Sequence, residues 1–250
     1  MEPAPRQRIR AVPAVTRAVA ILRLLDRADA PMGVNAIARE LDLVPSTCLH
    51  ILRALTEEEL VAVDPATKRY TLEAGIVSLA RRALRRDSFS NAVQPELDRL
   101  ARRHGLTTIG VRVVGLEHMI VVAISHADLG LRLHVDLGSR FPALISATGR
   151  CFAAFGDHPV EELERRFARL RWHRAPTLER WRREVAETAE KGFSLDEGDY
   201  IEGVSILGVP VLDRTGMMTH GLVAIGVIAQ IRRLGPERIA EELKAIVARL

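Results

Sequence analysis

LVPSTCLHILRAL, residues 43–55, is the stretch that decides how the N-terminal part of the chain folds. Pro45 suits a first helical position, because its φ is already helical and its missing N–H would have no partner there. The apolar residues recur with the spacing of one helix face: Cys48, Ile51, Leu52 and Leu55. The other side carries polar groups that can hydrogen-bond base edges or phosphates: Ser46, Thr47, His50 and Arg53. The pattern predicts a helix that enters a DNA major groove, the alternative being an ordinary surface helix.

The flanking segments give this helix a context. Apolar periodicity predicts helices over Thr16–Arg27 and Val34–Leu41 before it. After it, Leu60–Val63 and Arg69–Leu72 are strand-like and enclose a turn with a basic tip, which includes Lys68 and Arg69. Three helices followed by such a hairpin predict a winged helix-turn-helix over residues 13–72, with the wing touching phosphate or the minor groove.

Basic and amphipathic segments border this unit. Residues 1–12, which include Arg10, are rich in Arg and Pro and are predicted to form a flexible basic arm that adds phosphate contacts. Residues 73–90 are predicted to form a linker helix. Its narrow apolar stripe lies beside many arginines, so we expect it to pair across a homodimer rather than pack on its own unit.

Composition excludes several classes of protein. The chain has 250 residues, of which 48% are hydrophobic and 27% charged, and a net charge of +4, which is ordinary for a globular protein with a mild preference for polyanions. Its two cysteines form no metal or disulfide motif. The N-terminus lacks the apolar core of a secretion signal, and the longest apolar run is too short to span a membrane. We therefore expect a cytoplasmic protein without a membrane partner.

Residues 91–250 have a different character. Helices are predicted over Asn91–His104, Ser146–Phe155, Glu161–Leu170, Leu178–Lys191 and Glu237–Leu250. Strands are predicted over Thr107–Val114, His118–Ser125, Leu131–Val135, Gly203–Leu212 and Leu222–Ala229, with a loop over Asp136–Pro142. Antiparallel strands flanked by helices indicate an α+β domain that can enclose a small-molecule pocket.

Several stretches together resemble the IclR family of bacterial transcriptional regulators over nearly the whole chain. They are TRAVAILRLL, VPSTCLHILRAL, DPATKRYTL, SATGRCFAAF and GFSLDEGDYIEGVSILGVPVLDRTG. The resemblance implies an N-terminal winged helix-turn-helix, a linker helix and a C-terminal GAF-like α/β domain that binds an effector. It also implies dimers, or dimers of dimers, on operator DNA. We expect no cofactor.

The resemblance also implies roles for individual residues of the DNA-binding unit. Ser46 and Thr47 match the family's Ser-Thr pair at the start of the recognition helix, and Arg17 matches a basic residue that contacts phosphate. A basic residue, often Arg, commonly follows three positions after that Thr. Here it is His50, so the operator sequence is expected to differ from those of relatives.

In the C-terminal domain the family holds its ligand with backbone amides at a helix start and with polar strand residues. The matching positions here are Ala147, Thr148, Gly149, Asp196, Val204, Ile206, Gly226 and Ile228. Free amides and the helix dipole favour a carboxylate. Ile206 stands where a Cys is common, and Gly226 and Ile228 replace a polar pair. We therefore expect a larger and less polar organic acid, such as an aromatic one, unless these side chains point into the core.

An enzyme and a metal-responsive regulator are alternatives to this interpretation, and a third is an architectural DNA-binding protein with no ligand, which the size of the C-terminal domain disfavours. Ser146, Thr148, Cys151, Asp157 and His158 fit no nucleophile signature, so no catalytic residue is expected, and Ser146–Thr148 is better explained as a helix cap. The second is a metal-responsive regulator, because imidazole and carboxylate groups could converge from neighbouring strand ends. The candidate ligands are His126, Asp128, His134 and Asp136.

Overall fold

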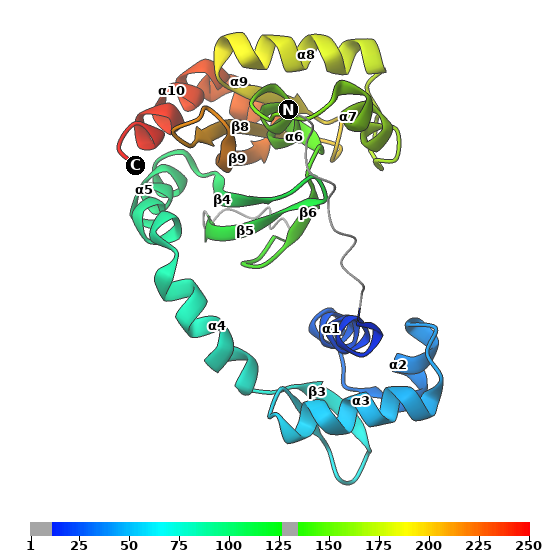
Figure 1. Cartoon of the computed structure of the whole chain (residues 1–250). Helices are drawn as coiled ribbons and strands as arrows, with labels where there is room; N and C mark the ends of the chain where they lie inside the picture. Colours follow the sequence, from blue (N-terminus) through cyan, green and yellow to red (C-terminus); the bar gives the residue numbers. More distant parts are fainter. Residues whose placement is uncertain (1–11, 127–134) are drawn as a thin grey trace. The chain divides into compact units, whose positions relative to one another are not determined.

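The computed structural model describes residues 12–126 and 135–250 (Figure 1). The chain divides into two compact units, the first ending at Arg86 and the second beginning at Asp87. Arg10, Asp128, His134 and nearly all of the predicted basic arm and of the predicted strand Leu131–Val135 lie outside the described residues. Within those residues, no helix combines the length and hydropathy that a transmembrane span requires.

The first unit is a winged helix-turn-helix. Its helices are α1 (Pro13–Asp26), α2 (Val34–Glu40) and α3 (Pro45–Glu57), and its strands are β1 (Met32–Gly33), β2 (Val61–Val63) and β3 (Arg69–Leu72). The three strands form an antiparallel sheet in the order β1-β3-β2. The strand β1 was not predicted, because two residues are too short to show a period. The helix α1 begins at Pro13, three residues before the predicted start.

The apolar face of α3 is fixed in the centre of this unit. Cys48, Leu52 and Leu55 are buried against side chains of α1, α2 and the hairpin, among them Ile21 and Tyr70. Each fully buried aliphatic side chain contributes about 1.5–3 kcal/mol, so the rotation of α3 about its axis is strongly determined. The polar face of α3 must therefore point away from the core.

The helix α4 (Gly75–Arg86) closes the first unit. Its first residue lies against the turn that follows α3: a Cβ on Gly75 would lie 2.3 Å from the carbonyl oxygen of Glu59, and the Gly75 amide donates to that oxygen. Leu79, a member of the predicted apolar stripe, is 69% exposed. The described part of the chain therefore leaves this position of the stripe uncovered.

The second unit is built on one antiparallel sheet in the order β6-β5-β4-β9-β8-β7. The strands are β4 (Thr107–Val114), β5 (His118–Ser125), β6 (Arg140–Pro142), β7 (Ser194–Glu197), β8 (Val204–Leu212) and β9 (Met218–Val227). The helices are α5 (Ser88–His104), α6 (Ser146–Ala154), α7 (Val160–Phe167), α8 (Leu178–Lys191), α9 (Ile228–Leu234) and α10 (Pro236–Val247). The predicted bounds of β4 and β5 are confirmed.

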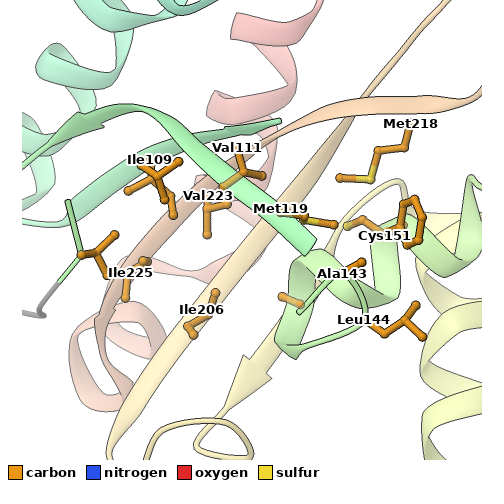
Figure 2. Close-up of a cluster of buried hydrophobic side chains, with 14 of the residues drawn as sticks. Ile109, Val111, Met119, Ala143, Leu144, Cys151, Ile206, Met218, Val223 and Ile225 are labelled. Carbon is orange, nitrogen blue, oxygen red and sulfur yellow. The ribbon is translucent and has the colours of Figure 1, made fainter. Parts of the chain in front are cut away.

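Each face of the sheet has its own core, because side chains alternate along a strand. Ile225 of β9 packs with Ile109 and residues of α6, α7 and α8, whereas the adjacent Ala224 packs with residues of α5 and α10. The close-up in Figure 2 shows the first of these two clusters. The second unit therefore has a helical layer on either face of one sheet.

Two predictions about strand ends were wrong. The segment Asp136–Pro142 is not all loop, because Arg140–Pro142 pairs with β5 as strand β6. The last strand ends at Val227, and Ile228 begins helix α9 instead of extending the strand to Ala229. In both places a short or apolar segment has no period that distinguishes strand from helix or loop.

Candidate nucleic-acid interface and ligand cavity

The polar face of α3 is exposed as its sequence predicted. Ser46, His50 and Arg53 are exposed and Thr47 is half-buried, on the side of the helix away from Cys48 and Leu52. Pro45 occupies the first helical turn, as predicted. Four side chains that can donate hydrogen bonds thus share one surface of a short helix. An α-helix is narrow enough to enter a major groove.

The wing is shaped by Asp64, a residue that the sequence analysis did not single out. One carboxylate oxygen of Asp64 accepts hydrogen bonds from the amides of Ala66 (2.7 Å) and Thr67 (3.0 Å). These amide donors hold the pKa of Asp64 below its ordinary value. The same turn places Lys68 in the left-handed region at φ 55°. The exposed Lys68 and Arg69 therefore lie at a fixed hairpin tip, a position suited to contact phosphate.

Arg17 is exposed on α1. Arg69 has a partner within the unit, since one guanidinium nitrogen donates to the carbonyl oxygen of Pro31 at 2.9 Å. Its remaining donors are available to a phosphate. That these residues contact DNA stays a prediction.

The second unit contains a cavity over one face of its sheet. The cavity, with its open mouth, has a volume of about 490 Å³. Its wall is almost wholly apolar and comes from β4, β5, β6, β8, β9, the start of α6 and the loop before β8. The lining residues are Ile109, Val111, Met119, Val135, Phe141, Ile145, Ser146, Thr148, Tyr200, Ile201, Ile206, Val223 and Ile225. Six of them are labelled in Figure 2.

The polar part of the wall is the start of α6. Ser146 has a left-handed φ of 58°, and successive amides on either side of such a residue form an anion-binding concavity. The first amides of a helix lack acceptors within the helix, and the first bond back into this turn is that of Gly149 to Ile145. The Ser146 hydroxyl is buried near Asp196 and makes no well-aligned hydrogen bond with a described residue. This end of the cavity therefore presents hydrogen-bond donors, and no charged side chain of the described residues lines the cavity itself.

Of the eight positions predicted to contact an effector, the structure brings two to the cavity: Thr148 and Ile206. The other six do not line it. Ala147 and Val204 are buried in the adjacent core, and Ile228 lies in α9. A Cβ on Gly226 would meet Leu106 on the opposite face of the sheet at 2.6 Å. The prediction therefore had the wrong face at the end of β9.

Gly149 is required for packing. A Cβ there would lie 2.0 Å from the backbone carbonyl carbon of Leu144, so the chain before α6 folds tightly against the helix because position 149 has no side chain. This close approach holds the amides of α6 at the cavity. The cap predicted over Ser146–Thr148 is also wrong, because neither side chain accepts a bond from the helix and the Thr148 hydroxyl donates to the carbonyl of Ile145.

We expect Gly149→Ala to lower the stability of the second unit by several kcal/mol, about the loss typical of a core overpacked against backbone. In most helices the change from Gly to Ala is stabilising by roughly 1 kcal/mol. A loss of stability in Gly149→Ala therefore distinguishes this close approach from an ordinary helical position. Gly33→Ala is the control, because its Cβ would meet nothing within 4 Å. Urea unfolding followed by circular dichroism measures both. Equal midpoints for the two variants would contradict the close approach.

Asp196 belongs to a buried charged cluster that the sequence did not reveal. Arg150 is fully buried, and its guanidinium lies 2.7 Å from Glu184, 3.3 Å from Asp199 and 4.0 Å from Asp196. Burial raises the pKa of Asp196, and Arg150 opposes that rise. The carboxylate is thus held by a cation of the protein and does not line the cavity.

The described residues give no support to a metal site or a nucleophile. Within residues 12–126 and 135–250, no three His, Cys, Asp or Glu side chains gather into a group that could hold a metal ion. His126 and Asp136 belong to this part of the chain and are exposed. Cys151 is buried, and burial raises the pKa of its thiol to about 12, so the reactive thiolate is not formed near neutral pH.

A winged helix-turn-helix with an exposed polar recognition helix is the fold of a DNA-binding regulator. Comparison with known proteins gives the family. Residues 14–65 match the IclR helix-turn-helix domain, and residues 81–250 match the bacterial transcriptional regulator IclR C-terminal domain. The chain therefore belongs to the IclR family of transcriptional regulators.

Individual relatives agree with this assignment. A glycerol operon regulatory protein of Streptomyces griseus is 30% identical over 234 residues, which is 91% of this chain and 89% of that protein. A probable transcriptional regulator, SauR, of Cupriavidus necator is 28% identical over 80% of each chain. The solved structure of an IclR transcriptional regulator from Alicyclobacillus acidocaldarius has a TM-score of 0.84 and 27% identity, and the match covers 96% of this chain and 98% of that one.

Proposed function

We propose that this regulator reads operator DNA with α3 and the wing, and that an aromatic or similarly apolar organic acid in the cavity modulates that binding. Residues 13–72 contact DNA, residues 73–90 link and pair subunits, and residues 91–250 bind the effector. The observation that carries the proposal is the cavity itself, an open apolar hollow whose polar end is the start of α6.

The DNA interface is argued from exposure and charge. Base edges are read by Ser46, Thr47, His50 and Arg53, because α3 presents them on its solvent face. Phosphates are held by Lys68 and Arg69 at the wing, by Arg17, and by Arg10 of the N-terminal arm. Two copies with a two-fold axis would place their α3 helices about 34 Å apart, in successive major grooves.

The double variant Lys68→Ala, Arg69→Ala is expected to weaken binding to all DNA sequences alike. Each lost phosphate contact lowers the dependence of log K on log salt by about 0.9, so the slope should fall by roughly 1.8. Fluorescence anisotropy at several salt concentrations measures the slope. Asp26→Asn, an exposed change on α1, serves as the control. An unchanged slope would remove the wing from the interface.

The ligand class follows from the composition of the cavity. A carboxylate is favoured at the start of α6, because amide donors and the helix dipole are available there. The other walls offer Ile, Val, Met and Phe side chains, which favour a ring or branched carbon skeleton over further hydroxyl groups. No Lys or Arg lines the described cavity, so the acid is bound through the backbone amides at the start of α6 and the Ser146 hydroxyl.

A thermal-shift panel of acids tests the ligand class. Benzoate and 2-naphthoate should stabilise the protein more than glyoxylate, and a ligand at 100 times its Kd contributes about 2.7 kcal/mol. Ser146→Ala should weaken the response to benzoate, whereas Ser88→Ala, an exposed change on α5, should not. Stabilisation by glyoxylate-sized acids alone would refute the proposal. Anisotropy with operator DNA, with and without benzoate, then tests regulation.

Dimerisation is argued from α4. Leu79 is left 69% exposed by the described residues, although its neighbours on the stripe, Ile76 and Ala80, are half-buried. A second copy of the helix would cover it, and the pair would transmit a change in the effector domains to the spacing of the two α3 helices. We propose a homodimer or a dimer of dimers acting in the cytoplasm, and analytical ultracentrifugation distinguishes the two.

A further inference from the structure

The loop of residues 198–203, here called the Asp199 loop, supplies two side chains of the cavity wall that no strand or helix holds. Most lining residues are held by the sheet ladder or by the start of α6, but Tyr200 and Ile201 come from this loop between β7 and β8. Glycines with left-handed φ bound it, at 83° for Gly198 and 74° for Gly203. Its place over the cavity therefore depends on what its other residues contact.

The beginning of the Asp199 loop is anchored by a buried carboxylate. Asp199 is 0% exposed and receives guanidinium groups from three elements. Arg180 of α8 lies 2.7 Å away, Arg174 of the segment before α8 lies 3.2 Å away, and Arg150 of α6 lies 3.3 Å away. A buried carboxylate is costly unless such partners surround it, so the three cations strongly favour this one position of the loop.

The loop backbone is held by further hydrogen bonds with Asp196 and Arg174. Asp196 accepts hydrogen bonds from the amides of Asp199 (2.9 Å) and Tyr200 (3.4 Å). Arg174 donates its own amide to the Asp199 carbonyl at 2.9 Å and a guanidinium nitrogen to the carbonyl of Glu197 at 3.2 Å. The residue directly before Tyr200 is thus fixed through both its side chain and its backbone.

We propose that Tyr200 and Ile201 are the specificity-determining wall of the cavity, selecting the size of the effector's ring, and that Asp199 and Arg174 are positioning residues for that wall. This rests on the proposed function, since it concerns the ligand of the same cavity. The sheet residues define a rigid floor, whereas the wall formed by this loop can be widened by single substitutions without disturbing a strand ladder.

The test compares two acids that share a carboxylate and differ in ring area, benzoate and 2-naphthoate, by isothermal titration calorimetry with the full-length protein. Ile201→Ala should shift the ratio of their Kd values about tenfold toward 2-naphthoate. Arg174→Gln should shift the ratio in the same direction, because the wall is then less firmly held. The control Glu202→Gln lies in the same loop with an 80% exposed side chain and should leave the ratio unchanged. Unchanged ratios in both Ile201→Ala and Arg174→Gln would overturn the proposal.

Hydrogen exchange separates positioning from selectivity. In Arg174→Gln the amides of residues 199–202 should exchange at least about tenfold faster while those of β4 and β5 keep the wild-type rate, and equal rates in the loop would overturn the positioning role. The same hydrogen-exchange measurement on Asp199→Asn tests the buried carboxylate that anchors the loop. If the wild type binds neither acid, the acid effector proposed above is refuted, and the ratio is measured with benzamide and 2-naphthamide instead. A tenfold shift with these amides supports the wall, and failure to bind them overturns both proposals.

Discussion

Replacing Ser46, Thr47 and His50 together by alanine is expected to abolish sequence-specific DNA binding while leaving the protein folded. The three side chains are exposed or half-buried and none belongs to the core of the first unit, so the thermal midpoint should change little. Each good base contact contributes about 1–3 kcal/mol, so the loss in specific affinity should be on the order of 100-fold or more. Non-specific binding, which depends on the basic wing and arm, should persist.

The measurement uses an operator selected from a random duplex pool with the wild-type protein, followed by anisotropy titrations at fixed salt. Asp29→Asn, an exposed change in the segment between α1 and β1, is the matched control and should keep full specificity. If the triple variant retained its preference for the selected operator over random DNA, α3 would not be the reading helix. A His50→Arg variant put through the same selection should choose a different operator, because a permanently charged bidentate donor favours guanine.

Arg150→Ala is expected to have the largest effect on stability. It removes a fully buried cation and leaves Glu184, Asp196 and Asp199 facing one another around a cavity. Breaking a buried ion pair by removing one partner costs about 3–5 kcal/mol, enough to unfold a marginally stable domain. Arg182→Ala is the control, because its pair with Glu164 is on the surface and exposed pairs contribute about 0–1 kcal/mol.

The pH dependence of the stability of Arg150→Ala is a second, independent test of this cluster. Burial raises the pKa of Asp196 in the folded state, and loss of Arg150 removes the charge that opposes the rise. A carboxyl group with a raised folded pKa binds its proton more tightly when folded, so the folded state loses stability as pH rises from the unfolded toward the folded pKa. The deficit of Arg150→Ala relative to wild type should therefore shrink as pH falls from neutral to mildly acidic. Urea midpoints at several pH values measure it, and a deficit that grows in acid would contradict this account.

The first unit could be predicted closely from the sequence because its signals are local. The 3.6-residue period of α3, the proline at its start and the hairpin with a basic tip each depend on residues close in the chain. The exposed placement of Ser46, His50 and Arg53 then follows from burying Cys48, Leu52 and Leu55. The short strand β1 was missed, because it exists only through its pairing with β3.

The cavity could be predicted less well, and the reasons are geometric. Position 226 was expected to face a ligand, but the alternation along β9 gives that face to Ile225, and a shift of one residue reverses every assignment on a strand. Asp196 was expected to bind the ligand, yet its partner is Arg150, 46 residues earlier in the chain (196 − 150). Pairings over such distances leave no periodic signal. Tyr200 and Ile201 were also missed, because residues in a loop have no periodic pattern that would place them at the cavity.

The two-faced sheet of the second unit has an evolutionary consequence. Along β4 and β9, the residues that line the cavity, such as Ile109 and Ile225, alternate with residues that hold α5 and α10, such as Ala224. Substitutions that reshape the cavity wall leave the second set untouched. A lineage of such regulators can therefore vary its cavity while inheriting the same scaffold.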